Sequence, residues 1–222
     1  MSKRRQELGD NLEAIKSRIR VAAENSGRSA DEVTLIVVTK TFPAEDVKIL
    51  YELGVRNFGE NRDQEASVKS LELADDCIWH FQGQIQSNKL KSIAAWADVL
   101  HSIDDISHAN KLNSLVSSKD IFIQVSLDNQ PNRGGVLPDL VPEFLAQLSA
   151  FSNLNIRGLM AVAPLGQEPV IAFERLKTLS DQVVKIDPRA NGISAGMSND
   201  FEAAISQGAT HIRIGSQILG VR

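Results

Sequence analysis

The chain alternates between two patterns of hydrophobic and polar positions. Short runs rich in β-branched residues, typical of strands, are separated by stretches whose apolar residues recur every three or four positions, typical of amphipathic helices. Eight strands are predicted, at residues 34–39, 55–58, 78–81, 99–103, 121–125, 156–160, 192–194 and 211–214. Seven helices are predicted between them, at residues 43–53, 61–73, 87–97, 105–117, 137–151, 168–184 and 199–207.

The first predicted strand ends in a lysine. Six of the seven residues from Val33 to Thr39 are β-branched, which favours a strand buried on both faces beneath helices. Lys40 follows, and Pro43 then opens a helical pattern. Lys40 is therefore predicted at the carboxyl end of a buried strand, which is the edge at which parallel α/β folds build their sites.

The order of these elements predicts a barrel. An amphipathic helix comes first, because apolar residues from Leu8 to Ile19 are spaced by four, three and four residues. We expect residues 1–222 to form one domain, with residues 1–27 as a helix outside the repeat. Eight strand and helix units of this length predict an α/β fold, a single (β/α)8 TIM barrel. A doubly wound sheet is the alternative, but its first turn is normally rich in glycine, and residues 39–43 contain none.

Composition narrows the class of protein. Hydrophobic residues make up 42% of the chain and charged residues 23%, which is ordinary for a globular protein. A net charge of -4 with dispersed basic residues is not the footprint of a nucleic-acid-binding protein. No apolar run is long enough to span a membrane. Because Cys77 is the only cysteine, it cannot form an internal disulfide, and we expect a cytoplasmic protein.

Lys40 has two interpretations. In the first, its side chain is solvated at the rim of the barrel, as most lysines are. Alternatively, partial desolvation lowers the pKa of the amine, so that a neutral fraction can attack an aldehyde and form a Schiff base. Lys40 alone does not decide between them.

Small residues rich in hydrogen-bond donors follow the seventh and eighth predicted strands. Gly196 precedes Ser198 and Asn199, either of which is predicted to cap the next helix, and Gly215 and Ser216 end the last strand. Each loop alone is explained as a helix cap. Barrels, however, frequently bind phosphate with the loops after strands seven and eight. Both loops together therefore favour a phosphate site.

Arg213 lies within the last predicted strand, on the face opposite to Ile212 and Ile214. It points into solvent, pairs with a carboxylate, or points into the barrel mouth as a fixed donor to a ligand. Lys40 and the predicted phosphate site face each other across that mouth. A ligand that bridges them carries an aldehyde and a phosphate, and pyridoxal 5'-phosphate (PLP) has both.

A resemblance supports this cofactor. The motifs that carry it occur in order along nearly the whole chain, at residues 38–41, 58–61, 79–83, 86–89, 157–161, 196–200 and 212–215. Together they resemble the YggS/PROSC family of pyridoxal phosphate homeostasis proteins. The resemblance implies the type III PLP fold, a barrel like the N-terminal domain of bacterial alanine racemase. It also implies an intracellular carrier or regulator of PLP without clear catalytic turnover, with PLP-dependent apoenzymes as recipients. We expect a monomer or weak dimer that binds no metal, nucleic acid or membrane.

The resemblance also implies roles for individual residues. Lys40 would form the Schiff base, and Arg213 would face the pyridine nitrogen and keep it unprotonated, which weakens the cofactor as an electron sink. The phosphate would be bound by Ser198, Asn199, Gly215 and Ser216. Weaker matches place four residues in the pocket wall: Asn61, His80, Met160 and Met197. His80 is explained equally well as a hydrogen-bonded core histidine, and Glu60 as the partner of a neighbouring cation.

The chain departs from the family pattern at three positions, one of which is Ile85, where leucine is common. Gln82 stands where an apolar residue is common, and Arg133 stands where many members have lysine. An arginine cannot capture the cofactor by Schiff-base chemistry, which affects a transfer role more than a binding role.

Two enzymes remain as alternatives. An amino-acid racemase of this fold needs a second acid or base on the opposite face of the cofactor, usually a tyrosine from a partner chain with an extra domain. The only tyrosine, Tyr51, is predicted at the end of the first barrel helix, remote from the mouth, and the length leaves no room for such a domain. An aldolase without cofactor would use Lys40 and the phosphate site, but it leaves Arg213 less well explained.

Overall fold

Eight parallel strands close into a barrel in the order of the sequence. The computed structural model describes residues 2–74, 76–128, 130 and 134–220. Closure occurs between the first and last strands, where β1 (Thr34–Val38) pairs in parallel with β8 (His211–Ile214). On its other side β1 pairs with β2 (Asn57–Glu60). The predicted (β/α)8 barrel is confirmed, and the doubly wound alternative is wrong because a closed barrel has no sheet edge.

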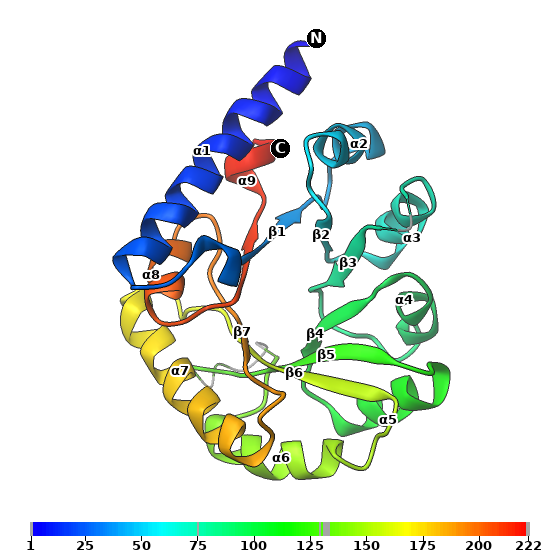
Figure 1. The fold of residues 1–222 in the computed structure, drawn as a ribbon. Helices are drawn as coiled ribbons and strands as arrows, with labels where there is room; N and C mark the ends of the chain where they lie inside the picture. Colours follow the sequence, from blue (N-terminus) through cyan, green and yellow to red (C-terminus); the bar gives the residue numbers. More distant parts are fainter. Residues whose placement is uncertain (1, 75, 129, 131–133, 221–222) are drawn as a thin grey trace.

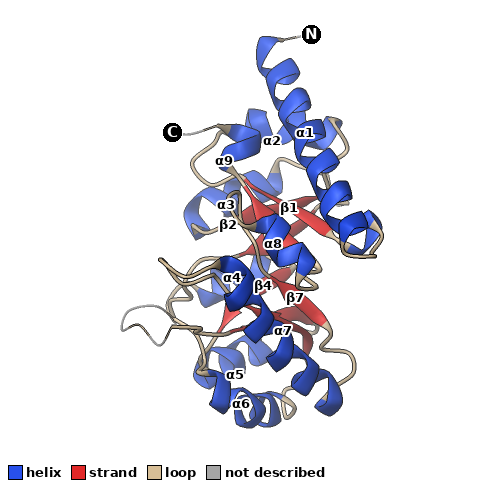
Figure 2. Cartoon of the chain, turned by 90° about the vertical axis from the view of Figure 1, so that its left-hand side faces the viewer, coloured by secondary structure: helices blue, strands red, loops and turns tan. Residues whose placement is uncertain are grey.

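Helices surround the strands on the outside (Figures 1 and 2). The other strands are β3 (Ile78–Phe81), β4 (Val99–Ile103), β5 (Lys119–Gln124), β6 (Leu154–Met160) and β7 (Gly192–Ser194). The helices are α1 (Lys3–Asn25), α2 (Ala44–Glu52), α3 (Asp63–Leu71), α4 (Leu90–Trp96), α5 (Ile106–Leu115), α6 (Val141–Leu148), α7 (Pro169–Ile186), α8 (Phe201–Ser206) and α9 (Ser216–Leu219). Two short 3-10 helices are η1 (Ala30–Glu32) and η2 (Pro138–Leu140).

The apolar stripe of α1 is buried as predicted. Leu8, Leu12, Ile15 and Ile19 are all at most 5% exposed. The helix packs against α8, α9 and α2, so it covers the seam where β8 meets β1. The extra helix thereby closes the side of the barrel that carries both ends of the repeat.

Some predicted boundaries are wrong for local reasons. The second strand begins at Asn57 and not at Val55, because the Val55 N–H closes the end of α2 by donating to the Leu50 carbonyl at 3.0 Å. The helix predicted at 137–151 is divided into η2, which begins at Pro138, and α6, in which Pro142 is the second residue; neither proline has an N–H to donate. The short helices η1 and α9 were not predicted from the hydrophobic pattern.

Two helix-to-strand joints are built as their glycines predict. Gly54 after α2 has φ 93° and Gly208 after α8 has φ 88°, the left-handed conformation that favours glycine at a helix end. These joints turn the chain back into β2 and β8.

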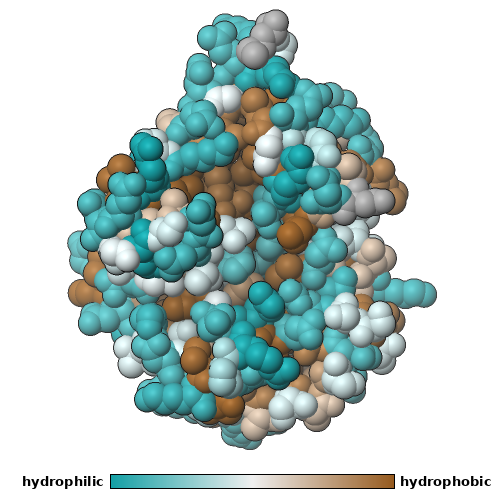
Figure 3. All heavy atoms as spheres, viewed as in Figure 1, coloured by the Kyte–Doolittle hydropathy of each residue, from teal (hydrophilic) through white to brown (hydrophobic). Residues whose placement is uncertain are grey.

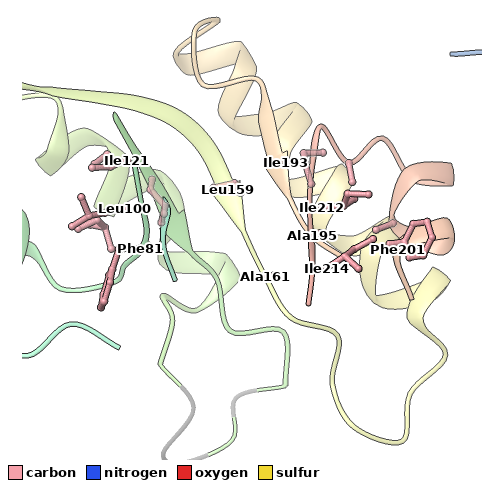
Figure 4. Close-up of a cluster of buried hydrophobic side chains, with 14 of the residues drawn as sticks. Phe81, Leu100, Ile121, Leu159, Ala161, Ile193, Ala195, Phe201, Ile212 and Ile214 are labelled. Carbon is pink, nitrogen blue, oxygen red and sulfur yellow. The ribbon is translucent and has the colours of Figure 1, made fainter. Parts of the chain in front are cut away.

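The barrel has an apolar outer layer and an interior that contains polar side chains beside a small apolar cluster of Val99, Phe122 and Met160. Alternate residues of the strands pack against the helices, and Figure 4 shows such residues from β3 to β8 together with Phe201 of α8. Ile212 and Ile214 belong to this outer layer, so alternation turns Arg213 inward. His80 and His101 also lie inside the barrel, where their rings contact each other. Strand patterning thus places polar side chains below the barrel mouth.

The outer surface is mostly hydrophilic on the face drawn in Figure 3, with hydrophobic residues in separate patches. Across the described residues, none of the helices combines the length and the apolar character that crossing a membrane requires.

Candidate functional site

A cavity of about 730 Å³ opens at the carboxyl ends of the strands. Its wall is formed by residues that follow β1, β2, β3, β6, β7 and β8. Lys40 and the loops after β7 and β8 all line it, and Lys40 follows the strand that pairs with β8. The structure therefore brings the predicted lysine and both predicted phosphate loops to one cavity.

Lys40 lies two residues beyond the end of β1, with an exposed side chain. Both of its neighbours are held from β2 and α3. The Thr39 hydroxyl donates to Glu60 Oε1 at 2.7 Å, and the Thr41 N–H donates to Glu65 Oε2 at 2.9 Å. Thr41 has φ 68°, a left-handed conformation that is costly for a residue with a branched side chain. These anchors set the backbone from which the Lys40 side chain departs.

A buried ion pair lies behind Lys40. Lys69 Nζ is 2.6 Å from Glu60 Oε1 and also donates to the Thr39 carbonyl at 2.8 Å. Burial raises the pKa of Glu60, while its hydrogen bonds from Lys69 and Thr39 oppose that rise. The expected cation partner of Glu60 is thus Lys69, which the sequence did not single out. The pair joins the end of β1 to β2 and α3.

The loops after β7 and β8 meet at the cavity. Ser216 Oγ donates to Ser198 Oγ at 3.2 Å, so the two loops touch through their hydroxyls. Within the described part of the chain, no acceptor contacts the backbone N–H groups of Ser198, Asn199 or Ser216. Donors from both loops are therefore available to an anion.

The predicted helix cap at Ser198 or Asn199 is wrong. Helix α8 begins at Phe201, and its N-cap is Asp200. Residues 198–200 form a turn instead, because Asp200 Oδ1 accepts the Met197 N–H at 2.6 Å. Ser198 and Asn199 therefore do not cap α8.

Gly196 is required for the approach of this loop to α8. It has φ 91°, and a Cβ atom there would lie 2.7 Å from the Ala204 Cβ atom and 2.8 Å from the Phe201 Cα atom. Any larger residue would push the loop, and Ser198 with it, away from its position.

Arg213 lines the cavity from below and is 5% exposed. Its Nη1 donates to Ser194 Oγ at 2.7 Å, and its Nη2 donates to the Ala161 carbonyl at 3.1 Å. No described carboxylate forms an ion pair with it. Burial lowers its pKa to about 10, so the guanidinium is still charged at neutral pH. Of the sequence interpretations, the inward-facing donor agrees with this geometry.

The predicted pocket residues fall into two groups. Those that line the cavity are Lys40, Asn61, Met160, Met197, Ser198, Asn199, Arg213, Gly215 and Ser216. His80 does not line it. Because His80 and Gln82 are two residues apart, their side chains point to the same face of the chain. Gln82 is closer to the barrel mouth and lines the cavity in place of His80. His80 lies deeper, 2% exposed, and is the hydrogen-bonded core histidine of the other interpretation.

Other residues add to this account. Gln82 and the loop from Val162 to Gly166 were not predicted as cavity wall. Gln82 Nε2 and Asn61 Oδ1 are both buried without a hydrogen-bond partner among the described residues. Tyr51 lies near the end of α2 against the Arg56 guanidinium, 4.0 Å from the ring centre, and does not line the cavity. Arg133 lies outside the described residues.

The histidines of the barrel interior predict acid sensitivity. Burial lowers the pKa of His80 from 6.5 to about 3 and that of His211 from 6.5 to about 4. Between these values and 6.5 the unfolded chain binds more protons than the folded one, so stability falls as the pH falls from 6.5. Each histidine costs about 1.4 kcal/mol per pH unit in this window.

We therefore expect the free energy of unfolding in urea to drop by a few kcal/mol between pH 6.5 and pH 5. In the variant His211→Phe the free energy of unfolding should fall less steeply, by about 1.4 kcal/mol per pH unit, which is the contribution of one histidine. Constant stability across this range in the native protein would contradict the prediction.

Comparison with known proteins identifies the family. Residues 11–222 match the family model described as alanine racemase, N-terminal domain. The chain is 39% identical over 240 residues to the pyridoxal phosphate homeostasis protein of Mycobacterium leprae, covering 98% of this chain and 93% of the relative. It is 33% identical over 227 residues to the Escherichia coli K12 protein of the same name, covering 97% of each. The chain belongs to the pyridoxal phosphate homeostasis protein family.

Solved structures agree with this membership. PipY from Synechococcus elongatus with PLP bound is 33% identical, with a TM-score of 0.84 over 96% of this chain and 100% of that one. Alanine racemase from Corynebacterium glutamicum shares the fold at 17% identity, with a TM-score of 0.68 over 95% of this chain and 61% of that one. PipY is thus similar to this chain over its whole length, whereas the racemase is similar to it over only 61% of its own length.

Proposed function

We propose that this member of the family binds PLP through a Schiff base on Lys40 and acts in PLP homeostasis in the cytoplasm as a carrier or regulator. The observation that carries the proposal is that the Lys40 side chain and the donor-rich loops of Ser198 and Ser216 line one cavity. PLP supplies an aldehyde and a phosphate, which match these two walls. The PLP-bound PipY structure supports the same ligand.

The residues present fit this cofactor. Free N–H groups and two hydroxyls at the loops suit a phosphate. Asn61 Oδ1 and Gln82 Nε2 are polar atoms of the cavity wall that have no partner among the described residues, and a polar ligand would satisfy them. Arg213 is a cation below the cavity, in the place proposed for the pyridine nitrogen.

The role as carrier or regulator without turnover is supported by what the cavity contains. An arginine at the pyridine nitrogen keeps that nitrogen unprotonated, so the ring withdraws electrons poorly. Among the described residues that line the cavity, the ionisable side chains are Lys40, Asp200 and Arg213. Asp200 accepts a backbone hydrogen bond from Met197 in its own turn. A racemase would need a further acid or base on the opposite face, and Tyr51 is too remote to supply it.

Two parts of the proposal concern partners. We propose PLP-dependent apoenzymes as recipients of the cofactor, and a monomer or weak dimer as the working form. A cofactor-free aldolase is less well supported, because that reaction does not explain the position of Arg213 below the cavity.

The proposal is tested on the purified native protein incubated with PLP and reduced with borohydride. We expect a visible absorption band before reduction and, after proteolysis, a phosphopyridoxyl group on Lys40 by mass spectrometry. A second incubation with a panel of amino acids should give no product. A protein that takes up no PLP would overturn the cofactor, and rapid turnover of an amino acid would overturn the carrier role.

A further inference from the structure

We propose that a buried hydrogen-bond chain is a one-directional relay that positions the Arg213 guanidinium and balances its charge with dipoles. The inference rests on the proposed function for its link to PLP, although the relay itself is a property of the free protein. The relay consists of Asn57 of β2, His80 of β3, His101 of β4 and Ser194 of β7.

The relay crosses the interior of the barrel. Asn57 Oδ1 lies 3.0 Å from His80 Nε2, and His80 Nδ1 lies 2.9 Å from His101 Nε2. His101 Nδ1 lies 2.9 Å from Ser194 Oγ, which receives Arg213 Nη1 at 2.7 Å. His80, His101 and Ser194 are each at most 2% exposed. Four hydrogen bonds thus connect Arg213 of β8 through β7, β4 and β3 to the half-buried Asn57 of β2.

The direction of every bond follows from the Asn57 amide oxygen, which faces His80. Asn57 Oδ1 can only accept, so His80 Nε2 carries the proton. A neutral histidine has one ring proton, so His80 Nδ1 accepts from His101 Nε2. His101 Nδ1 must then accept from the Ser194 hydroxyl. The Ser194 oxygen keeps its lone pairs for Arg213. Each group therefore donates away from Arg213 and accepts towards it.

This direction suits a buried cation without a carboxylate. Every acceptor atom in the relay faces the guanidinium side, so the negative ends of the dipoles point towards Arg213. The titratable groups that bear on the relay rings are His211 on His80, and His80, Arg213 and His211 on His101. The cations Arg157 and Arg213 bear in turn on His211. These cations and burial both disfavour protonation of the rings. The relay thereby stabilises Arg213 while leaving its positive charge available to a ligand.

A carboxylate in place of the relay would neutralise Arg213 and compete with the ligand. The relay instead holds Nη1 through Ser194, while the Ala161 carbonyl holds Nη2. The guanidinium plane is thereby fixed from two strands. We infer that PLP affinity depends on residues that never touch the cofactor.

The first experiment examines the free protein. Long-range 15N–1H NMR of the imidazole rings should show His80 and His101 as neutral Nε2–H tautomers between pH 6 and pH 8. An Nδ1–H tautomer or a cationic ring at either position would overturn the relay. This result does not depend on whether PLP binds.

The second experiment links the relay to the cofactor with a matched pair of variants. His101→Phe keeps the stacking on Phe122, 4.6 Å between ring centres, but breaks the relay. His211→Phe removes a half-buried histidine that also packs on Phe122, but its Nδ1 bonds to Thr210 outside the relay. We expect PLP to bind ten- to a hundredfold more weakly to His101→Phe and with a shifted absorption maximum. His211→Phe should remain near the native protein.

Ser194→Ala removes only the hydroxyl that joins Arg213 to the relay, and it replaces His101→Phe if that variant does not fold. It should weaken PLP binding to a similar degree. Equal affinity and spectrum in the relay variants and His211→Phe would overturn the inference. Failure of the proposed function is distinguishable, because the native protein would then form no adduct on Lys40.

Discussion

The variant Lys40→Ala is expected to take up no PLP covalently. Lys40 is the only lysine among the described residues that line the cavity, so its loss leaves no amine there to attack the aldehyde. After borohydride reduction, mass spectrometry should find no phosphopyridoxyl peptide. The visible band of the native complex should disappear, while circular dichroism and the urea midpoint change little because the side chain is exposed.

Two controls make this result specific. Lys40→Arg keeps the positive charge but offers a guanidinium, which does not form the imine, so it should also fail to attach PLP. Lys91→Ala removes an exposed lysine on α4 and should attach PLP like the native protein. A reducible adduct that persists in Lys40→Ala would show that another lysine captures the cofactor.

Much of the fold could be predicted because strand and helix patterns are local. The β-branched run before Lys40 predicts β1, and glycines at 54 and 208 predict the turns into β2 and β8. The start of α8 could not be predicted in the same way. Ser198 and Asn199 are good capping residues, but the Asp200 carboxylate captures the Met197 N–H and moves the start of the helix to Phe201.

The cavity could be predicted in part, since the carboxyl ends of parallel strands meet at one edge. Lys40, Arg213 and the loops with Ser198 and Ser216 follow from that rule. The place of His80 does not follow from it, because residues two apart on a strand share a face but differ in depth. Which layer reaches the mouth depends on the tilt of the strands in the closed barrel.

The hydrogen bonds inside the barrel also could not be predicted from the sequence. His80, His101, Ser194 and Arg213 come from four separate strands, and nothing in their spacing along the chain indicates that they bond to one another. Only the register of the closed barrel places β4 opposite β7. Residues that position Arg213 are therefore found from geometry alone.

The same holds for the support of Lys40. Lys69 looks like any helix lysine in the sequence, but α3 carries it against the end of β1, where it meets Glu60 and the Thr39 carbonyl. The cavity thus has two separate supports, a charged one below Lys40 and a neutral one below Arg213. The larger effect on stability is expected from the charged support, which is the ion pair of Glu60 and Lys69.

Replacing Lys69 by methionine is expected to destabilise the protein by about 3–5 kcal/mol. Methionine fills the space but leaves the Glu60 carboxyl, which is fully buried, without its cation. It also removes the donor to the Thr39 carbonyl next to Lys40. The measurement is the free energy of unfolding in urea at pH 7, where an unpaired buried carboxylate is most costly.

Lys48→Met is the matched control, because Lys48 Nζ is likewise paired with a glutamate, Glu72, at 2.7 Å, but both side chains are at least 40% exposed. That pair should contribute less than about 1 kcal/mol. The double variant Glu60→Leu with Lys69→Met removes both buried charges and should recover only part of the loss, because no unpaired charge remains while the Thr39 hydroxyl and carbonyl still lack their partners. If Lys69→Met and Lys48→Met lowered stability equally, the buried pair would not be what holds the end of β1, and the orientation of Lys40 would depend on the Thr41 to Glu65 contact instead.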